Sequence, residues 1–171
     1  MTERRFSAVE VLTPAHRVAG FNCGSDDETI WLQHYGLAAQ NSRSSRTYVV
    51  RRPSDDRVVA FHTLTAGAVL PVRAPRRLAT SVESYPISVV ILTRLGVDLS
   101  EHGQGLGCAL LVDALQRVNA AADIVGVHAL LVHAPNQKAR DFCQAVAEFE
   151  ASPTDPFHLF LLIKDLRRSF T

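Results

Sequence analysis

The sequence predicts an α+β domain, in which antiparallel hairpins precede a strand–helix–strand–helix segment. Two runs rich in β-branched residues flank the turn Pro53–Asp56, as in a hairpin. The most apolar strand, Ile87–Val97, leads through alternate glycines into an amphipathic helix. A short buried strand, Ala129–Ala134, leads into a second helix. This order is typical of a layered sheet with helices packed on it.

Length and composition indicate one globular domain over residues 1–171. Hydrophobic residues make up 47% of the chain, enough for a core. The apolar runs are too short to span a membrane, and the N-terminus has no apolar signal-peptide core, so we expect a cytoplasmic protein. Three cysteines without a CxxC pair, Cys23, Cys108 and Cys143, argue against a disulfide framework and a zinc site.

The N-terminal part predicts one strand and one helix. The segment Arg5–Leu12 alternates weakly and is expected to be a strand. A helix over Glu28–Gln40 follows, capped by Ser25 or by one of the two aspartates after it. Gly36 is expected to divide this helix into two short pieces.

The middle of the chain predicts a hairpin and a long connection. The hairpin strands are Thr47–Arg52 and Val58–Val69. The connection Pro71–Tyr85 is longer than most loops inside a compact domain, so it is expected to be functional or mobile.

The C-terminal part continues the alternation of helix and strand. A helix is expected over Gly105–Ala122, and another begins at Pro135–Asn136 after the buried strand. A last strand is expected over Phe157–Ile163, followed by a tail that carries Arg167 and Arg168.

The charge is unevenly distributed although the net charge is only +1. The segment from Arg43 to Arg77 holds eight arginines and two acids, whereas the segment from Asp98 to Asp165 holds nine acids and four basic residues. Because the guanidinium fork binds phosphate bidentately, the basic segment predicts contacts with an anionic partner. Solvated surface arginines are the alternative explanation.

The glycines Gly103, Gly105 and Gly107 lie between a strand and a helix, where backbone N–H groups hold a phosphate. The loop is not a Walker A motif, because no Gly-Lys-Ser/Thr follows. The spacing also disfavours a dinucleotide site of the GxGxxG type. A coenzyme A pyrophosphate site and an ordinary glycine-rich helix entry both remain possible.

The run from His102 to Gly107 resembles the core signature of the GNAT (Gcn5-related N-acetyltransferase) superfamily, Gln/Arg-x-x-Gly-x-Gly/Ala. His102 replaces the usual Gln or Arg. A second helix of the superfamily carries Asn, Ala, an aromatic residue and Tyr; here Asn136, Ala139 and Phe142 match, and Cys143 stands at the Tyr position. The resemblance implies a GNAT fold, with a mixed, mostly antiparallel sheet of about six to seven strands and about four helices.

The chain is more closely similar to the TacT-like toxins of type II toxin–antitoxin systems. Blocks in the family's order carry this resemblance: Phe21–Gly24, Ser45–Val49, Phe61–Thr65, Leu92–Asp98, Leu110–Leu115 and Ala129–Ala134. The resemblance implies acetylation of the α-amino group of aminoacyl-tRNA, which blocks translation. An acetyltransferase of a small-molecule or protein amine, and a weakly active or non-catalytic module, are the alternatives.

The resemblance also implies a site for acetyl-CoA as co-substrate. The residues expected to bind it are Leu95, Gly96, Val97, His102, Gly103, Gln104, Gly105, Leu106, Gly107, Cys108 and Asn136. The backbone N–H of Val97 is the expected oxyanion donor. The acid for the leaving thiolate is Cys143 or water, and a small buried cysteine without a catalytic role is equally compatible with the sequence.

The implied partners are aminoacyl-tRNA, a ribbon–helix–helix antitoxin and a second copy of the chain. The arginines expected to hold the tRNA backbone are Arg43, Arg46, Arg51, Arg73, Arg76 and Arg77. The histidines show no metal-ligand spacing, so no metal is expected. The sequence offers no compelling general base.

Overall fold

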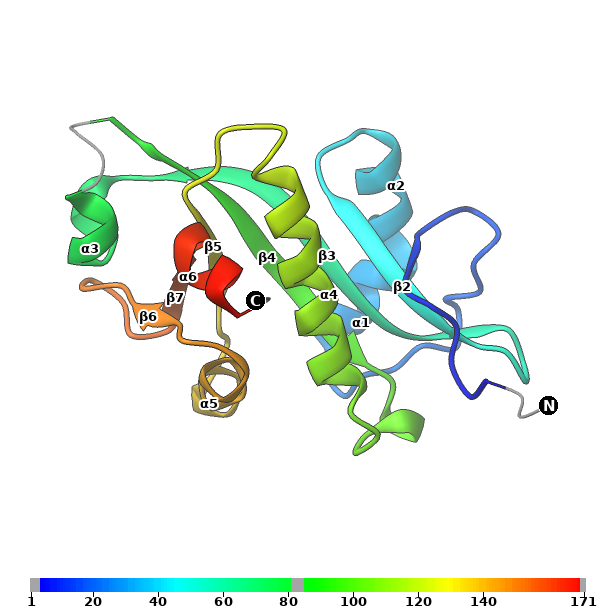
Figure 1. Ribbon diagram of the computed structural model, residues 1–171. Helices are drawn as coiled ribbons and strands as arrows, with labels where there is room; N and C mark the ends of the chain where they lie inside the picture. The colour runs from blue at the N-terminus through cyan, green and yellow to red at the C-terminus, as the bar shows by residue number, and fades with distance from the viewer. Residues whose placement is uncertain (1–3, 81–84, 170–171) are drawn as a thin grey trace. The chain divides into compact units, whose positions relative to one another are not determined.

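The computed structural model describes residues 4–80 and 85–169 (Figure 1). Within these residues the chain forms seven strands: β1 (Glu10–Val11), β2 (Arg46–Arg52), β3 (Arg57–Val69), β4 (Ile87–Val97), β5 (Ala129–His133), β6 (Glu150–Ala151) and β7 (His158–Leu162). The α-helices are α1 (Asp26–Ile30), α2 (Gly36–Asn41), α3 (Arg76–Ala79), α4 (Leu106–Ala121), α5 (Gln137–Val146) and α6 (Ile163–Arg168). A π-helical turn, Trp31–Tyr35, joins α1 to α2, and the 3-10 turns are Pro71–Arg73 and Leu99–Glu101.

The strands form one sheet in the order β1-β2-β3-β4-β5-β7-β6. The pairs β1–β2, β2–β3, β5–β7 and β6–β7 are antiparallel, and β4–β5 is parallel. A parallel pair needs a crossover connection, which α4 supplies here. The predicted α+β class with a mixed, mostly antiparallel sheet is therefore confirmed.

The chain divides into two compact units. The first comprises Met1–Leu64 and Arg94–Asp113, and the second comprises Thr65–Thr93 and Ala114–Thr171. That one domain over residues 1–171 contains both units stays a prediction.

In the first unit, both faces of the sheet are covered. The α1–α2 segment packs on one face, where Leu32 meets Val49 and Phe61, and the start of α4 packs on the other, where Leu110 meets Val50 (Figure 1). Val49 and Val50 point to opposite faces because side chains alternate along a strand.

A β-bulge in β3 adjusts this packing. The register pairs Val50 with Ala60 and Arg51 with Val58, so Val59 is an extra residue in β3. As a result, both Val59 and Ala60 contribute to the core beneath α4.

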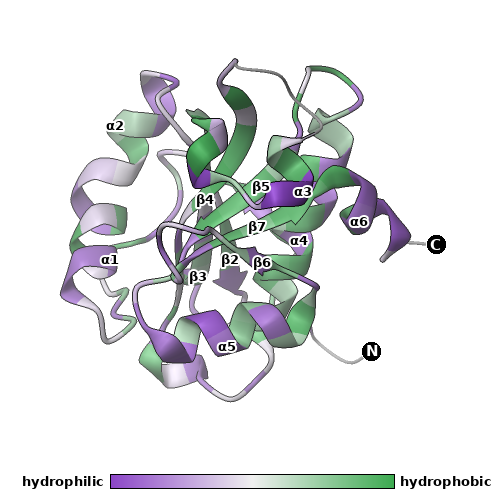
Figure 2. Cartoon of the chain, turned by 90° about the vertical axis from the view of Figure 1, so that its left-hand side faces the viewer, coloured by the Kyte–Doolittle hydropathy of each residue, from purple (hydrophilic) through white to green (hydrophobic). Residues whose placement is uncertain are grey.

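The second unit has a core of its own. Ile87 and Val89 of β4 pack with Leu131 of β5, Phe160 of β7 and Leu78 of α3. Helix α5 carries both hydrophilic and hydrophobic residues in Figure 2, as expected for a helix with one exposed side.

Several predicted boundaries are wrong. Of the predicted strand Arg5–Leu12, only Glu10–Val11 pairs as a strand; Ser7 still lies against Arg51, whose amide donates to the Ser7 hydroxyl at 2.8 Å. At this edge of the sheet, the Ser7 hydroxyl thus accepts a hydrogen bond that a backbone carbonyl would accept in a regular strand pair. The predicted C-terminal tail is helical in α6, because Leu166 is fully buried.

The N-terminal helix and the long connection also differ from the predictions. Ser25 caps α1, as predicted, but Gly36 does not interrupt the helix. It lies at the change from π to α geometry, where an added Cβ would come within 3.3 Å of the Trp31 ring. Within the connection Pro71–Tyr85, the described residues include a 3-10 turn and α3; residues 81–84 lie outside the described part.

Candidate functional site

The candidate site in the first unit is built on the end of β4. Asp98 caps the following 3-10 turn, since its Oδ1 accepts from the Ser100 amide at 3.0 Å, and its Oδ2 accepts from the Asn22 amide at 3.0 Å. Burial alone would raise the pKa of Asp98, but the hydrogen bonds from Ser100 and Asn22 together lower it. The carboxylate therefore joins the Phe21–Gly24 segment to the end of the strand.

The glycine loop has the backbone that a phosphate cradle requires. Gly103 and Gly105 have φ of +78° and +79°, and a Cβ at either position would have no neighbour within 4 Å. The left-handed conformation, and not lack of space, thus favours glycine at both positions. The open side of the loop and the start of α4 at Leu106 fit the pyrophosphate of coenzyme A.

The His102 side chain is hydrogen-bonded to the protein and is not free at this open surface. Its Nε2 lies 2.7 Å from the carbonyl oxygen of Val97, so the ring ties the loop back to β4. The histidine that replaces the usual Gln or Arg therefore has a structural role in this loop. Gln104 and Cys108, also predicted to contact the coenzyme, are exposed in the loop and in the first turn of α4.

The strand segment Leu95–Val97 borders an aromatic layer. A Cβ on Gly96 would come within 3.0 Å of the Phe61 ring and 3.2 Å of the Cys23 sulfur, so glycine is needed for this close approach. The Phe61 ring stacks on Trp31, with centroids 6.1 Å apart and an angle of 12° between the planes.

Arg94 and Glu28 continue this layer. The Arg94 guanidinium lies 5.0 Å from the centre of the Trp31 ring, and its Nη1 lies 3.4 Å from Oε2 of Glu28. Burial raises the pKa of the Glu28 carboxyl, and Arg94 offsets only part of this effect. Sequence reasoning missed both residues; the Ser25-x-x-Glu28 capping pattern was the only local signal.

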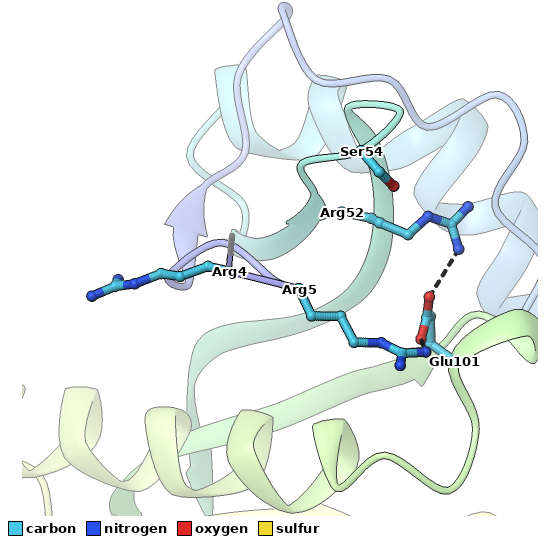
Figure 3. Close-up of a pocket in the computed structure, with 5 residues that line it drawn as sticks. All are labelled: Arg4, Arg5, Arg52, Ser54 and Glu101. Carbon is cyan, nitrogen blue, oxygen red and sulfur yellow. Dashed lines mark hydrogen bonds and ion pairs between the residues drawn. The ribbon is translucent and has the colours of Figure 1, made fainter. Parts of the chain in front are cut away.

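A basic pocket of about 320 Å³ lies at Glu101, the last residue of the 3-10 turn before the glycine loop (Figure 3). Its lining is Arg4, Arg5, Arg52, Ser54 and Glu101. Arg5 and Arg52 each donate to Glu101 at 2.9 Å, and hydrogen bonds from Arg52 first and then Arg5 lower the pKa of this carboxyl against the effect of burial. The pocket therefore contains an ion-pair network that joins the N-terminal segment and the hairpin to the end of the 3-10 turn.

Two further predicted site residues, Asn136 and Cys143, lie at the start of α5 and within it, in the second unit. Asn136 caps α5, and its Oδ1 accepts from the Ala139 amide at 2.9 Å. Cys143 is 5% exposed, and burial raises the pKa of its thiol to about 11. The thiol is therefore protonated at neutral pH but is a weak acid.

The six predicted RNA-binding arginines fall into both units. Arg43 and Arg46 are exposed in the first unit, and Arg73 and Arg76 are exposed in the second. Among the described residues, two of the six, Arg51 and Arg77, have acidic partners. Arg51 pairs with Glu10 at 2.8 Å and with Asp56 at 2.9 Å.

Arg77 forms ion pairs with two acidic residues. It pairs with Glu150 and, at 3.1 Å, with Asp165, which also pairs with Arg168. Asp165 is 6% exposed, and hydrogen bonds from Arg77 and Arg168 lower its pKa although burial acts the other way. Arg77 therefore has a structural role in holding α3 to β6 and α6.

Two negative findings concern the described residues alone. Residues 4–80 and 85–169 contain no group of three or more His, Cys, Asp or Glu side chains that could hold a metal ion. In the same part of the chain, no helix is long and apolar enough to cross a membrane.

The curated relatives of the chain include two toxins. The chain is 41% identical over 162 residues to a protein named tRNA-acetylating toxin from Mycobacterium tuberculosis (strain ATCC 25618 / H37Rv), with 95% of each protein covered. It is 25% identical over 167 residues to a probable toxin TacT from Sinorhizobium fredii (strain NBRC 101917 / NGR234), covering 93% of this chain and 92% of the relative. No protein-family model matches the chain.

Solved structures give a similar result. AtaT complexed with acetyl-methionyl-tRNAfMet has a TM-score of 0.88 at 26% identity and covers 97% of this chain and 99% of its own. AtaTR bound with AcCoA has a TM-score of 0.83 at 26% identity, covering 98% and 99%. A tyrosine-to-phenylalanine mutant of KacT has a TM-score of 0.89 at 23% identity, covering 98% and 100%, which supports the fold alone.

Proposed function

The chain belongs to the family of GNAT-fold tRNA-acetylating toxins, and we propose that it transfers the acetyl group of acetyl-CoA to the α-amino group of aminoacyl-tRNA. The observation that carries the proposal is the glycine loop, in which Gly103 and Gly105 have left-handed backbones with open space beside them, directly before α4. Acetylation converts the amine to an amide, which cannot attack the next peptidyl ester, so translation stops.

The coenzyme is proposed to bind along β4 and the loop. The backbone of Gly103 to Gly107 and the first turn of α4, including Cys108, would hold the pyrophosphate. The thioester would lie along Leu95–Val97. Asn136 would contact the coenzyme from the start of α5.

Negative charge develops at two points of the reaction, and the protein must stabilise or neutralise it at both. Attack of the amine places a negative charge on the thioester oxygen, which the Val97 N–H would stabilise. Collapse of the tetrahedral intermediate releases a thiolate that must gain a proton. Cys143 is the proposed donor, because burial keeps its thiol protonated. A donor with a pKa of about 11 is a weaker acid than an ordinary thiol.

The tRNA is proposed to bind through the arginines of the basic segment. Arg43, Arg46, Arg73 and Arg76 are exposed and fit a phosphate backbone. Arg51 and Arg77 share their charge with acids and would contribute less.

We further propose that the protein acts in the cytoplasm as a homodimer and is neutralised by a ribbon–helix–helix antitoxin. Structures of AtaT with the C-terminus of the antitoxin AtaR support an antitoxin partner. The partnership is tested by co-expression of the chain with its candidate antitoxin, which should restore growth.

The decisive experiment incubates the protein with radiolabelled acetyl-CoA and bulk charged tRNA. We expect label in N-acetyl-aminoacyl-tRNA and none in uncharged tRNA. Label in small amines or proteins instead would favour a GNAT enzyme without an RNA substrate, and no transfer at all would favour a non-catalytic module.

A further inference from the structure

Glu28 occupies a position that normally closes a helix cap, but its carboxylate is directed elsewhere. Ser25 caps α1 through its hydroxyl, which accepts from the Glu28 amide. In a capping box, the glutamate three residues after the cap returns to the amide of the cap residue. Here the Glu28 carboxylate meets Arg94 of β4.

This carboxylate is incompletely satisfied. Oε2 of Glu28 is buried, and its contact with Arg94 is an ion pair of 3.4 Å without the geometry of a good hydrogen bond. A buried carboxylate oxygen with one long contact has room for a better hydrogen-bond donor, and such positions call for an explanation. A ligand that brings N–H donors and positive charge would satisfy it.

A series of contacts connects Glu28 to the end of β4. Arg94 and Gly96 point to the same face of the strand, because side chains alternate. Arg94, Trp31 and Phe61 stack in sequence on this face, and Phe61 touches Gly96. The layer therefore runs from Glu28 to the backbone of Leu95–Val97, where the proposed function places the thioester.

An acceptor amine must approach this same segment. In solution an α-amino group is largely protonated below its pKa of about 8, and the ammonium form cannot attack a carbonyl. A carboxylate on this side of the strand would attract the ammonium and take its proton.

We propose that Glu28 is the acceptor-site base, which binds the α-ammonium group of the aminoacyl ester and takes the proton that it loses before attack. This inference rests on the proposed function and adds a residue to it. Arg94, held against Trp31, acts as a positioning residue that directs the carboxylate toward the strand.

The protons balance in this scheme. The ammonium gives one proton to Glu28, and the neutral amine forms the new N–C bond to the acetyl carbon. As the C–S bond breaks, the nitrogen loses its second proton and the thiolate gains one. Glu28 returns its proton to water, which reaches the side chain because it is 25% exposed.

The titratable surroundings favour this role. Burial raises the pKa of Glu28, Arg94 partly reverses this effect, and the negative charge of Asp27 raises the pKa further. A carboxylate with a raised pKa is a stronger base than an ordinary glutamate, closer to the pKa of an α-amino group.

The test is the Glu28→Gln variant, which keeps the shape and removes the charge. We expect kcat/KM for bulk charged tRNA to fall by about 100-fold at pH 6.5, within the range of general base catalysis. The deficit should shrink by pH 9, where the amine is already neutral. Affinity for acetyl-CoA, measured by calorimetry, should not change. A merely structural role would not produce this pH dependence.

Two further variants complete the experiment. Asp26→Asn removes an exposed carboxylate from the same turn and should behave as wild type. Glu28→Asp keeps a carboxylate and should retain more activity than Glu28→Gln at pH 6.5, which also separates a chemical effect from misfolding.

The outcomes are distinguishable. If the wild type acetylates charged tRNA and Glu28→Gln matches it, or loses the same factor at every pH, the assignment of Glu28 is overturned. If the wild type itself forms no N-acetyl-aminoacyl-tRNA, the proposed function fails, and this inference fails with it.

Discussion

Nε2 of His62 lies 2.8 Å from Oδ2 of Asp113, and this contact joins the middle of β3 to the helix that follows the glycine loop. The His62 side chain is fully buried, whereas that of Asp113 is 17% exposed. The ring of His62 also stacks on Tyr48, with centroids 5.1 Å apart. A polar contact beneath α4 thus fixes the helix whose first turn is proposed to hold the coenzyme.

Replacement of His62 should destabilise the protein and loosen the loop. His62→Ala removes a buried hydrogen-bond partner of Asp113, which costs about 2 kcal/mol of unfolding free energy. We expect a higher KM for acetyl-CoA as well, because α4 loses a contact that holds it against β3. Urea denaturation and steady-state kinetics measure the two effects. His34→Ala, at an exposed histidine, is the control and should change neither.

Alanine at Gly103 or Gly105 should impair coenzyme binding more than stability. Each residue has positive φ, which costs an alanine about 1 kcal/mol, but neither position has a steric obstacle. Gly126→Ala is a matched control, since an added Cβ there also meets nothing within 4 Å and its φ is not positive. Calorimetry with acetyl-CoA should show weaker binding for the loop variants alone. Equal affinities in all three variants would contradict the proposed cradle.

Stability should fall in acid partly because of Glu101. Its pKa is lower in the folded protein than the usual 4.5, so the unfolded chain binds its proton first as the pH falls. Its contribution is complete well above pH 4.5 and is lost as the pH falls through the folded pKa. Glu101→Gln should cost about 2 kcal/mol at pH 7, because charge-assisted hydrogen bonds from Arg5 and Arg52 are lost. Urea denaturation at pH 7, 5 and 3.5 should show a shallower acid dependence for the variant.

Arg76 and Arg77 are neighbours with different expected effects. Arg76→Ala should weaken binding of charged tRNA and reduce the slope of log K against log salt by about 1, without loss of stability. Arg77→Ala should lower the melting temperature as well, because Asp165 loses one of its two arginine partners. Binding titrations over a range of salt concentrations and thermal unfolding separate the two effects. Unchanged binding by the double variant, with a steep salt dependence, would remove this surface from the tRNA site.

Cys143→Ala tests the proton donor. If the thiol protonates the leaving thiolate, kcat should fall about 100-fold, at the lower end of the range for general acid catalysis, while the KM for acetyl-CoA stays constant. An unchanged kcat would assign the proton to water. Alkylation provides a second measurement: the exposed Cys108 should react with iodoacetamide in the folded protein, and Cys143 should not, because burial raises the pKa of its thiol.

The local elements of the site follow from the sequence. The strand Ile87–Val97, the glycine loop, the cap at Asn136 and the hairpin all lie where the pattern predicts them. Each depends on signals within a few residues: β-branched runs, glycines that permit positive φ, and a side chain that caps the next turn. Such signals act before any tertiary contact forms, so they can be read from the chain alone.

The tertiary structure decided which polar groups meet. Glu28 and Arg94 are separated by more than sixty residues of sequence, and Arg77 and Asp165 by more than eighty; no local pattern pairs them. The burial that raises the pKa of Cys143 likewise comes from packing around α5. The sequence therefore determined the loop that would hold the coenzyme. Packing determined which side chains can move protons or share charge, because electrostatic effects depend on burial and distance, which only the folded chain defines.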